Sequence, residues 1–277
     1  MLGRARKAQN VIRGSDPRSL SLNSRHDREK GAWRKAHLSR LVIVSNRVAL
    51  PEKSRQTSGG LVTGVLDALR EAGGIWFGWS GEIAGTQPVQ QRVTEAEGLT
   101  YATVDLTRED HGGYYNGFSN AALWPLFHYR LDLVEFTRRD FAAYQRVNTL
   151  FADHLAPMLL PDDLIWVHDY HLIPMAENLR RAGVTQRIGF FLHTPFPSFG
   201  MLAVLPHHES LLEWLCAYDL VGFQTIDDLT AFHEAVVRGA SGKVLSDGRV
   251  RAFGRTIRAG VFPIGVDTEA IAKMAVP

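Results

Sequence analysis

Short apolar runs recur along the chain, and most of them end in polar residues. Runs of about four to eight residues bounded by turn residues are typical of buried parallel strands, whereas apolar residues at helical spacing are typical of amphipathic helices. The runs predict strands at 41–46, 75–79, 99–105, 164–168, 188–193, 219–224 and 257–264. The helical spacing predicts helices at 60–72, 117–130, 138–157, 172–182, 207–216 and 227–239.

Strands and helices alternate along nearly all of residues 39–277, which predicts one α/β domain. Alternation of this kind favours a doubly wound, Rossmann-like fold with a mostly parallel sheet. The predicted strand at 99–105 differs from the others because apolar and polar residues alternate along it. We therefore expect this strand to be antiparallel or to lie at an edge of the sheet.

Charge is distributed unevenly. Residues 1–40 hold 11 Lys and Arg against 3 Asp and Glu, a net charge of +8, so the rest of the chain carries −6 of the overall +2. With few periodic apolar residues, the segment 1–38 is predicted to be a disordered basic tail. A translation start assigned too far upstream, a natural solvated extension and an organelle-targeting peptide all remain open, although the acidic residues disfavour the last. No folded nucleic-acid-binding motif accompanies the charge, so we expect no nucleic-acid partner.

Composition otherwise matches a globular protein, with 45% hydrophobic and 22% charged residues. No apolar run reaches the ~18–20 residues that cross a membrane, and the N-terminus lacks the apolar core of a secretory signal. We therefore expect a cytoplasmic protein with no membrane partner. The single cysteine, Cys216, excludes an internal disulfide and is predicted to be buried. The oligomeric state stays open, with a homo-oligomer as one alternative.

Polar residues follow three of the predicted strands. Arg47 follows the first, His168–His171 the fourth and His193 the fifth. Carboxyl ends of parallel strands meet at one edge of a sheet, where ligands bind in open α/β folds. Asp169 can accept hydrogen bonds from sugar hydroxyls, and His193 can donate to or accept from a reacting group. The histidines alternatively have structural roles. A metal is not expected, because the set of ligands is too small.

The segment Tyr114–Arg130 combines seven aromatic or imidazole side chains with two asparagines and an arginine. Aromatic faces cover sugar rings while amides and guanidinium groups reach hydroxyls and phosphates, so the mixture favours a sugar-binding surface. A helix whose aromatic residues only fill the core is the alternative. Gly59 and Gly60 precede a predicted helix, where a phosphate could approach the backbone, although an ordinary turn would also fit.

Eight motifs in a fixed order carry a family resemblance. They read VSNRV, SGGL, WFGWSG, YYNGFSNAALWPLFHYR, IWVHDYHL, GFFLHTPFP, DLVGFQT and VFPIGVD. Over residues 41–271 the chain resembles the N-terminal half of the trehalose-6-phosphate synthases, retaining glycosyltransferases with two Rossmann-like domains (the GT-B fold). The resemblance implies transfer of glucose from UDP-glucose to glucose 6-phosphate, two small-molecule substrates, and no cofactor.

The resemblance also implies roles for individual residues. The acceptor glucose 6-phosphate would contact Arg47, Tyr115, Trp124 and Asp169. The donor would contact Gly59, Gly60 and His193, with Trp79 near the same pocket, and His193 and Asp169 would be the catalytic residues. Trp124 and Thr194 fall at positions associated with selecting the α anomer of the acceptor. The chain departs from the family at Gly200, where a glutamate is usual.

The family's second Rossmann-like domain, which holds the donor diphosphate, has no counterpart in residues 39–277. The resemblance therefore implies that this chain is inactive alone, because alignment of donor and acceptor needs both walls of the cleft. Two alternatives remain open. One is a related transferase with another acceptor, such as glycerol 3-phosphate, and the other is a non-catalytic sugar-phosphate-binding fragment.

Overall fold

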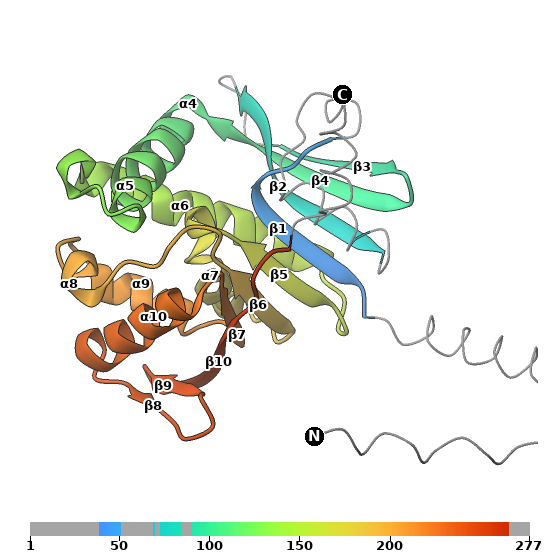
Figure 1. The fold of residues 1–277 in the computed structure, drawn as a ribbon. Coiled ribbons are helices and arrows are strands. Elements are labelled where there is room, and N and C mark those ends of the chain that lie inside the picture. Colours follow the sequence, from blue (N-terminus) through green and yellow to red (C-terminus); the bar gives the residue numbers. More distant parts are fainter. Residues whose placement is uncertain (1–38, 51–68, 70–72, 85–89, 266–277) are drawn as a thin grey trace, which may run out of the picture. The chain divides into compact units, whose positions relative to one another are not determined.

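A computed structural model describes residues 39–50, 69, 73–84 and 90–265 (Figure 1). The predicted tail 1–38, the glycine pair Gly59–Gly60 and, apart from residue 69, the predicted helix 60–72 lie outside these residues. No helix among the described residues is both long and apolar enough to cross a membrane.

Ten strands form one sheet in the order β3-β4-β2-β1-β5-β6-β7-β10-β9-β8. From β4 to β10 every neighbouring pair is parallel, while β3, β9 and β8 are added antiparallel. This arrangement confirms the predicted mostly parallel sheet. The strands are β1 (Leu41–Arg47), β2 (Gly74–Ala84), β3 (Gln91–Ala96), β4 (Leu99–Thr107), β5 (Leu164–His168), β6 (Arg187–Phe191), β7 (Leu220–Phe223), β8 (Lys243–Val244), β9 (Val250–Ala252) and β10 (Arg255–Val261).

Helices lie between β4 and β5 and between each later pair of parallel strands, whereas β2 leads to β4 through β3. The longer ones start at threonine N-caps, whose side chains accept from backbone N–H groups, at Thr137 for α6 and at Thr225 for α10. The helices are α4 (Arg108–Asp110), η1 (His111–Leu123), α5 (Trp124–Phe127), η2 (Leu131–Leu133), α6 (Arg138–Leu155), η3 (Ala156–Met158), η4 (Tyr170–Leu172), α7 (Met175–Arg181), α8 (Phe199–Leu202), α9 (His208–Leu215) and α10 (Ile226–Gly239).

The predicted strand at 99–105 is the place where the sheet differs most from expectation. β4 is antiparallel to β3, as one alternative proposed, but it is parallel to β2 and does not lie at the edge. The edge strand on this side is β3. It was not predicted from the sequence, because most of its residues are polar and solvent-exposed and form no apolar run. The expectation that the strand at 99–105 lies at the edge was therefore wrong, because β3 pairs with β4 on its outer side.

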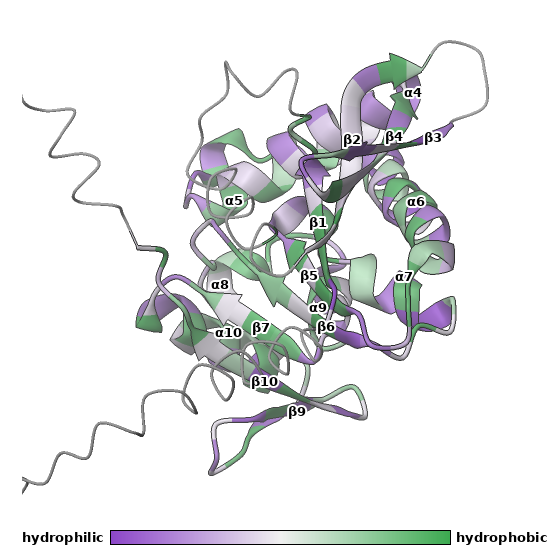
Figure 2. Cartoon of the chain, turned by 90° about the vertical axis from the view of Figure 1, so that its right-hand side faces the viewer, coloured by the Kyte–Doolittle hydropathy of each residue, from purple (hydrophilic) through white to green (hydrophobic). Residues whose placement is uncertain are grey.

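The main core lies between one face of the sheet and the described helices, and Val44, Val167 and Phe190 are among its fully buried strand residues. In Figure 2, α6 carries both hydrophilic and hydrophobic residues, as expected of a helix with one face against this core. A second, smaller cluster on the opposite face includes Leu69. Cys216 is free and buried, as predicted.

The order of the strands creates a topological switch point. From β1 the chain builds outward through β2 and β4, and then it restarts at β5 on the other side of β1 (Figure 1). The carboxyl ends of β1 and β5 are therefore adjacent. In open α/β sheets this is the position at which ligands bind.

Candidate functional site

Three polar residues stand at the carboxyl ends of the strands around this switch point. Arg47 ends β1, Asp169 follows β5 and His193 follows β6 by two residues. The backbone N–H of Asp169 donates to the carbonyl of Phe191 at 2.8 Å, and the backbone N–H of His193 donates to Oδ1 of Asp169 at 3.3 Å. These two bonds hold the loops after β5 and β6 together, as the sequence predicted for the carboxyl edge.

Asp169 has an unusual backbone and an unusual carboxyl group. Its φ of 74° and ψ of 166° fall in a region that is almost restricted to glycine, and such strain gathers at functional sites. Burial raises the pKa of its carboxyl to about 6, although hydrogen bonds from the backbones of Tyr170 and His193 partly oppose this shift. The Asp169 carboxylate can thus accept hydrogen bonds from a ligand in a site that is partly shielded from water.

Arg47 and the half-buried Tyr115 pack against the buried Trp79 beside the switch point. The Arg47 guanidinium lies 5.8 Å from the centre of the Trp79 ring, and the Trp79 and Tyr115 rings are 5.9 Å apart. At Gly81, which has a φ of +86°, a Cβ atom would stand 2.7 Å from Nε of Arg47. The positive φ favours glycine there, and a side chain at this position would displace the Arg47 guanidinium.

The aromatic segment divides between core and site. Its helix η1 has the wide turns of a π-helix, a form that occurs often at functional sites. Tyr114 and Phe118 are buried, and the Tyr114 hydroxyl donates to Oδ1 of Asn46 at 2.8 Å. Tyr115 is only half-buried and stacks on His171, with ring centres 5.7 Å apart. The core interpretation is therefore confirmed for Tyr114 and Phe118, while a sugar-binding role for the rest of the segment stays a prediction.

Trp124 belongs to the exposed part of this segment. It is 43% exposed and stacks on His128 with ring centres 4.2 Å apart. His128 is close enough to Asp169 to lower the pKa of that carboxyl. The Tyr129 hydroxyl donates to the carbonyl of Phe196 at 3.2 Å, which joins this segment to the loop after His193. Trp124 therefore lies on the rim of the switch-point site and not in the core.

Trp124→Ala is expected to leave the folded protein nearly as stable as before. A buried tryptophan costs ~3–5 kcal/mol when truncated, whereas surface changes usually stay within about 0.5 kcal/mol. Thermal or urea unfolding of the variant measures the difference. Phe118→Ala is the matched control, because Phe118 comes from the same segment and is fully buried. Equal losses for the two variants would show that Trp124 belongs to the core.

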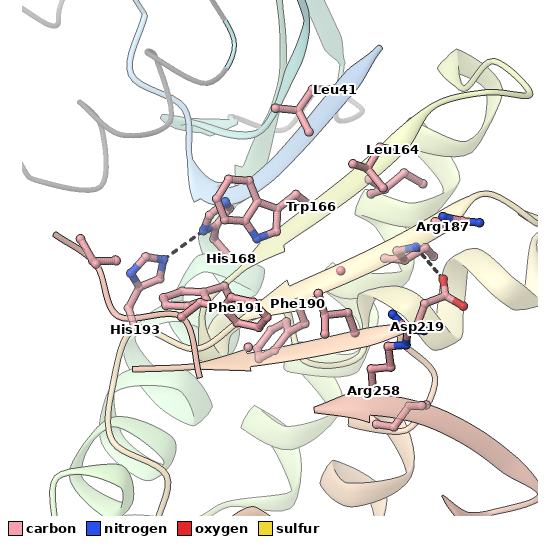
Figure 3. Close-up of a pocket in the computed structure, with 18 of the residues that line it drawn as sticks. Leu41, Leu164, Trp166, His168, Arg187, Phe190, Phe191, His193, Asp219 and Arg258 are labelled. Atoms are coloured by element: carbon pink, nitrogen blue, oxygen red, sulfur yellow. Dashed lines mark hydrogen bonds between the residues drawn. The ribbon is translucent and has the colours of Figure 1, made fainter. Parts of the chain in front are cut away.

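A pocket of about 900 Å³ opens beside the site (Figure 3). His168 and His193 stand at one end of it, while Arg187, Asp219 and Arg258 stand at the other, and aromatic residues lie between. Nδ1 of His168 and Nε2 of His193 are 3.0 Å apart. Burial lowers the pKa of His168 to about 3, with the nearby His193 as a smaller cause, and burial lowers the pKa of His193 to about 4. Both rings are therefore neutral near pH 7.

The remaining predicted residues are placed as follows. Thr194 is half-buried next to His193, and its hydroxyl oxygen is buried without a hydrogen-bond partner among the described residues. Gly59 and Gly60 lie outside those residues. At Gly200 an added Cβ would meet no atom within 4 Å, so the described fold does not require glycine there. In the described ranges, no group of three or more His, Cys, Asp or Glu side chains could hold a metal ion.

Two features of the site escaped the sequence prediction. One is the contact between His168 and His193, which are 25 residues apart. The other is the strained backbone of Asp169, an aspartate where glycine would be expected. The position of the Arg47 side chain beside β2 could have been predicted. A glycine within a strand, such as Gly81 after Trp79 and Ser80, indicates that another group approaches the backbone closely.

A doubly wound sheet with Arg47, Asp169 and His193 at the carboxyl ends of its central strands defines a Rossmann-like α/β domain with a candidate ligand site at its switch point. The chain belongs to glycosyltransferase family 20, whose model matches residues 39–276. A trehalose-6-phosphate synthase from Cronobacter sakazakii is 51% identical over 236 residues, which are 85% of this chain and 50% of that protein. The predicted resemblance is thereby confirmed.

Solved structures agree with this relationship. An α,α-trehalose-phosphate synthase (UDP-forming) from Burkholderia xenovorans in complex with glucose-6-phosphate has a TM-score of 0.80 and 52% identity, covering 86% of this chain and 52% of that one. A structure from E. coli bound with UDP-2-fluoro glucose has a TM-score of 0.79 and 49% identity, with the same coverage. The predicted fold class, half of a GT-B enzyme, is confirmed. The chain spans about half the length of the curated relatives it matches.

Proposed function

We propose that this chain forms the acceptor-side wall of an α,α-trehalose-phosphate synthase, which transfers glucose from UDP-glucose to glucose 6-phosphate with retention. The observation that carries the proposal is the hydrogen bond from the His193 backbone to Asp169 at the switch point, with Arg47 at the end of the neighbouring strand β1. The relative crystallised with glucose-6-phosphate supports the acceptor, and the relative bound with UDP-2-fluoro glucose supports the donor.

Each side chain has a distinct task in this proposal. The Arg47 guanidinium binds the acceptor phosphate through charge-assisted hydrogen bonds. Tyr115 supports the apolar face of the acceptor sugar, and Trp79 packs against Tyr115 and the Arg47 guanidinium near the pocket of the transferred glucose. Asp169, ionised above about pH 6, accepts hydrogen bonds from sugar hydroxyls. Trp124 and Thr194 shape the part of the site that selects the acceptor anomer.

Retention is assigned to a front-face reaction. The acceptor hydroxyl attacks the face from which the diphosphate leaves, and the departing diphosphate takes the hydroxyl proton, so no covalent glycosyl–enzyme intermediate forms. His193 contacts the transferred glucose and holds it during this step. Charge that develops on the diphosphate is met by backbone N–H groups, Gly59 and Gly60 among them, and by cations of the second domain, an electrostatic role.

Arg47→Ala, in the complete polypeptide, is expected to raise the KM for glucose 6-phosphate much more than the KM for UDP-glucose. Charge-assisted hydrogen bonds are worth roughly 1.5–3 kcal/mol, which corresponds to about ten- to hundredfold in KM. Arg47→Lys should recover only part of the loss, because the planar fork is replaced by a point charge. Initial rates with each substrate varied in turn measure both constants. A defect confined to UDP-glucose would contradict the assignment of this wall to the acceptor.

The function itself is tested by UDP release from the complete polypeptide with different acceptors. Rapid release with glucose 6-phosphate and none with glycerol 3-phosphate supports the proposal. Release with glycerol 3-phosphate instead would identify a related transferase with another acceptor. Binding of glucose 6-phosphate without any UDP release would identify a non-catalytic sugar-phosphate-binding protein.

A further inference from the structure

His168 is a buried histidine at the end of β5 to which neither the sequence nor the proposed reaction assigned a task. It is 2% exposed, and its ring lies beside Trp166, with ring centres 4.4 Å apart. Its Nδ1 faces Nε2 of His193 at 3.0 Å, and the two rings are nearly stacked at an angle of 28° (Figure 3). Its other nitrogen, Nε2, is buried with no hydrogen-bond partner among the described residues.

Only one of the two rings can donate in this contact. A neutral imidazole carries a single N–H, and the hydrogen bond made by one nitrogen determines the role of the other. If His193 donated from Nε2, the proton of His168 would sit on its own Nε2 and would be buried without an acceptor. Orphaned buried N–H groups are rarer in proteins than orphaned acceptors. The lower-energy arrangement therefore places the proton of His168 on Nδ1, where it has a partner.

We infer that His168 is a positioning residue whose Nδ1–H donates to Nε2 of His193 and thereby keeps the proton of His193 on Nδ1. His193 then presents a hydrogen-bond donor, and not an acceptor, to the group bound at the switch point. The backbone of His193 is fixed independently by its N–H bond to Asp169. His168 thus controls the direction of the side-chain hydrogen bond, while Asp169 controls the position of the loop.

The consequence for the ligand rests on the proposed function, in which the bound group is a glucosyl unit. Of the hydroxyl oxygens on such a group, those that face His193 would act as acceptors. A tautomer fixed before binding avoids reorganisation when the ligand arrives, which is the advantage of preorganised polar groups. The arrangement of the two rings does not depend on the identity of the ligand.

Long-range ¹H–¹⁵N correlation NMR of this chain with ¹⁵N-labelled histidines tests the inference directly, because protonated and unprotonated imidazole nitrogens differ widely in chemical shift. His193→Gln identifies the signals of His193. The expected result is a proton on Nδ1 in both His168 and His193 near pH 7. A proton on Nε2 of His193 would overturn the inference.

Two substitutions at His168 separate positioning from simple packing. His168→Asn keeps an N–H donor at the place of Nδ1, because its amide nitrogen is also bonded to Cγ, whereas His168→Leu fills the space without a donor. We expect the asparagine variant to keep the proton of His193 on Nδ1 and the leucine variant to give a mixture of tautomers. His154→Leu, in α6, is the control and should leave the tautomer unchanged. An unchanged tautomer in a folded His168→Leu protein would contradict the inference, and if that variant does not fold, the unsubstituted spectrum still decides.

Kinetics of the complete polypeptide then measure what the tautomer contributes. His168→Leu is expected to lower kcat about tenfold, the effect of one lost hydrogen bond, with little change in the KM for glucose 6-phosphate. His168→Asn should restore most of the rate. Equal kcat values for the leucine and asparagine variants would contradict the positioning role. The NMR experiment needs no substrate, so it tests the tautomer separately from the reaction. If the predicted tautomer is found but the complete polypeptide releases no UDP, the proposed function is contradicted and the inference about His168 is not.

Discussion

Incubated alone with UDP-glucose and glucose 6-phosphate, this chain is expected to release no UDP at a rate normal for enzymes, about 1–10³ per second. Holding two reactants in alignment supplies roughly 7–11 kcal/mol of the lowered barrier, and that alignment is lost when one wall of the cleft is missing. The switch-point residues described here are assigned mainly to the acceptor. The relatives that match this chain are about twice its length. A coupled assay for UDP measures the rate.

The complete polypeptide, assayed under the same conditions, is the positive control. Circular dichroism and a cooperative unfolding transition should show that the isolated chain is folded, so that inactivity does not reflect misfolding. Turnover by the folded isolated chain at one per second or faster would contradict the expectation that a second wall is required.

Asp169→Asn is expected to stabilise the fold while removing most of the activity. The raised pKa of about 6 means that the folded state binds the proton more tightly than the unfolded chain, whose aspartates titrate near 3.9. The contribution of Asp169 to stability is therefore greatest below about pH 4 and is lost as the pH rises to about 6, by up to about 3 kcal/mol. The neutral amide removes that cost at pH 7 and still accepts the hydrogen bond from the backbone of His193.

Loss of the carboxylate should lower kcat/KM for glucose 6-phosphate in the complete polypeptide by about ten- to a hundredfold, the effect of losing charge-assisted hydrogen bonds to the sugar hydroxyls. Urea unfolding of the isolated chain from pH 4 to 8 measures the stability change. Asp162→Asn is the matched control at an exposed aspartate and should change neither quantity. A destabilised variant with normal activity would show that Asp169 has a structural role only.

Local pattern was sufficient for most of the individual strands. The strand predicted at 164–168 appears as β5 with the same limits, because five consecutive strand-forming residues are bounded by a turn on each side. The long helix predicted at 138–157 ends only two residues early. The helix in the aromatic segment was predicted to begin at residue 117, whereas η1 begins at His111, because Gly112 and Gly113 interrupt the helical pattern at its start.

The sequence also determined the family, since eight motifs in a fixed order can be recognised without knowing any contact between residues. It also placed Arg47, Asp169 and His193 at strand ends. Tertiary structure alone decided how these ends are arranged. The strand order puts β1 beside β5, although 116 residues separate Arg47 from the start of β5 in the chain. The contact between His168 and His193, and the exposure of Trp124 beside buried Phe127, follow from packing between distant segments. Local periodicity predicts which face of a helix or strand is buried. Which other strand or helix packs against that face is determined only when the whole sheet has assembled.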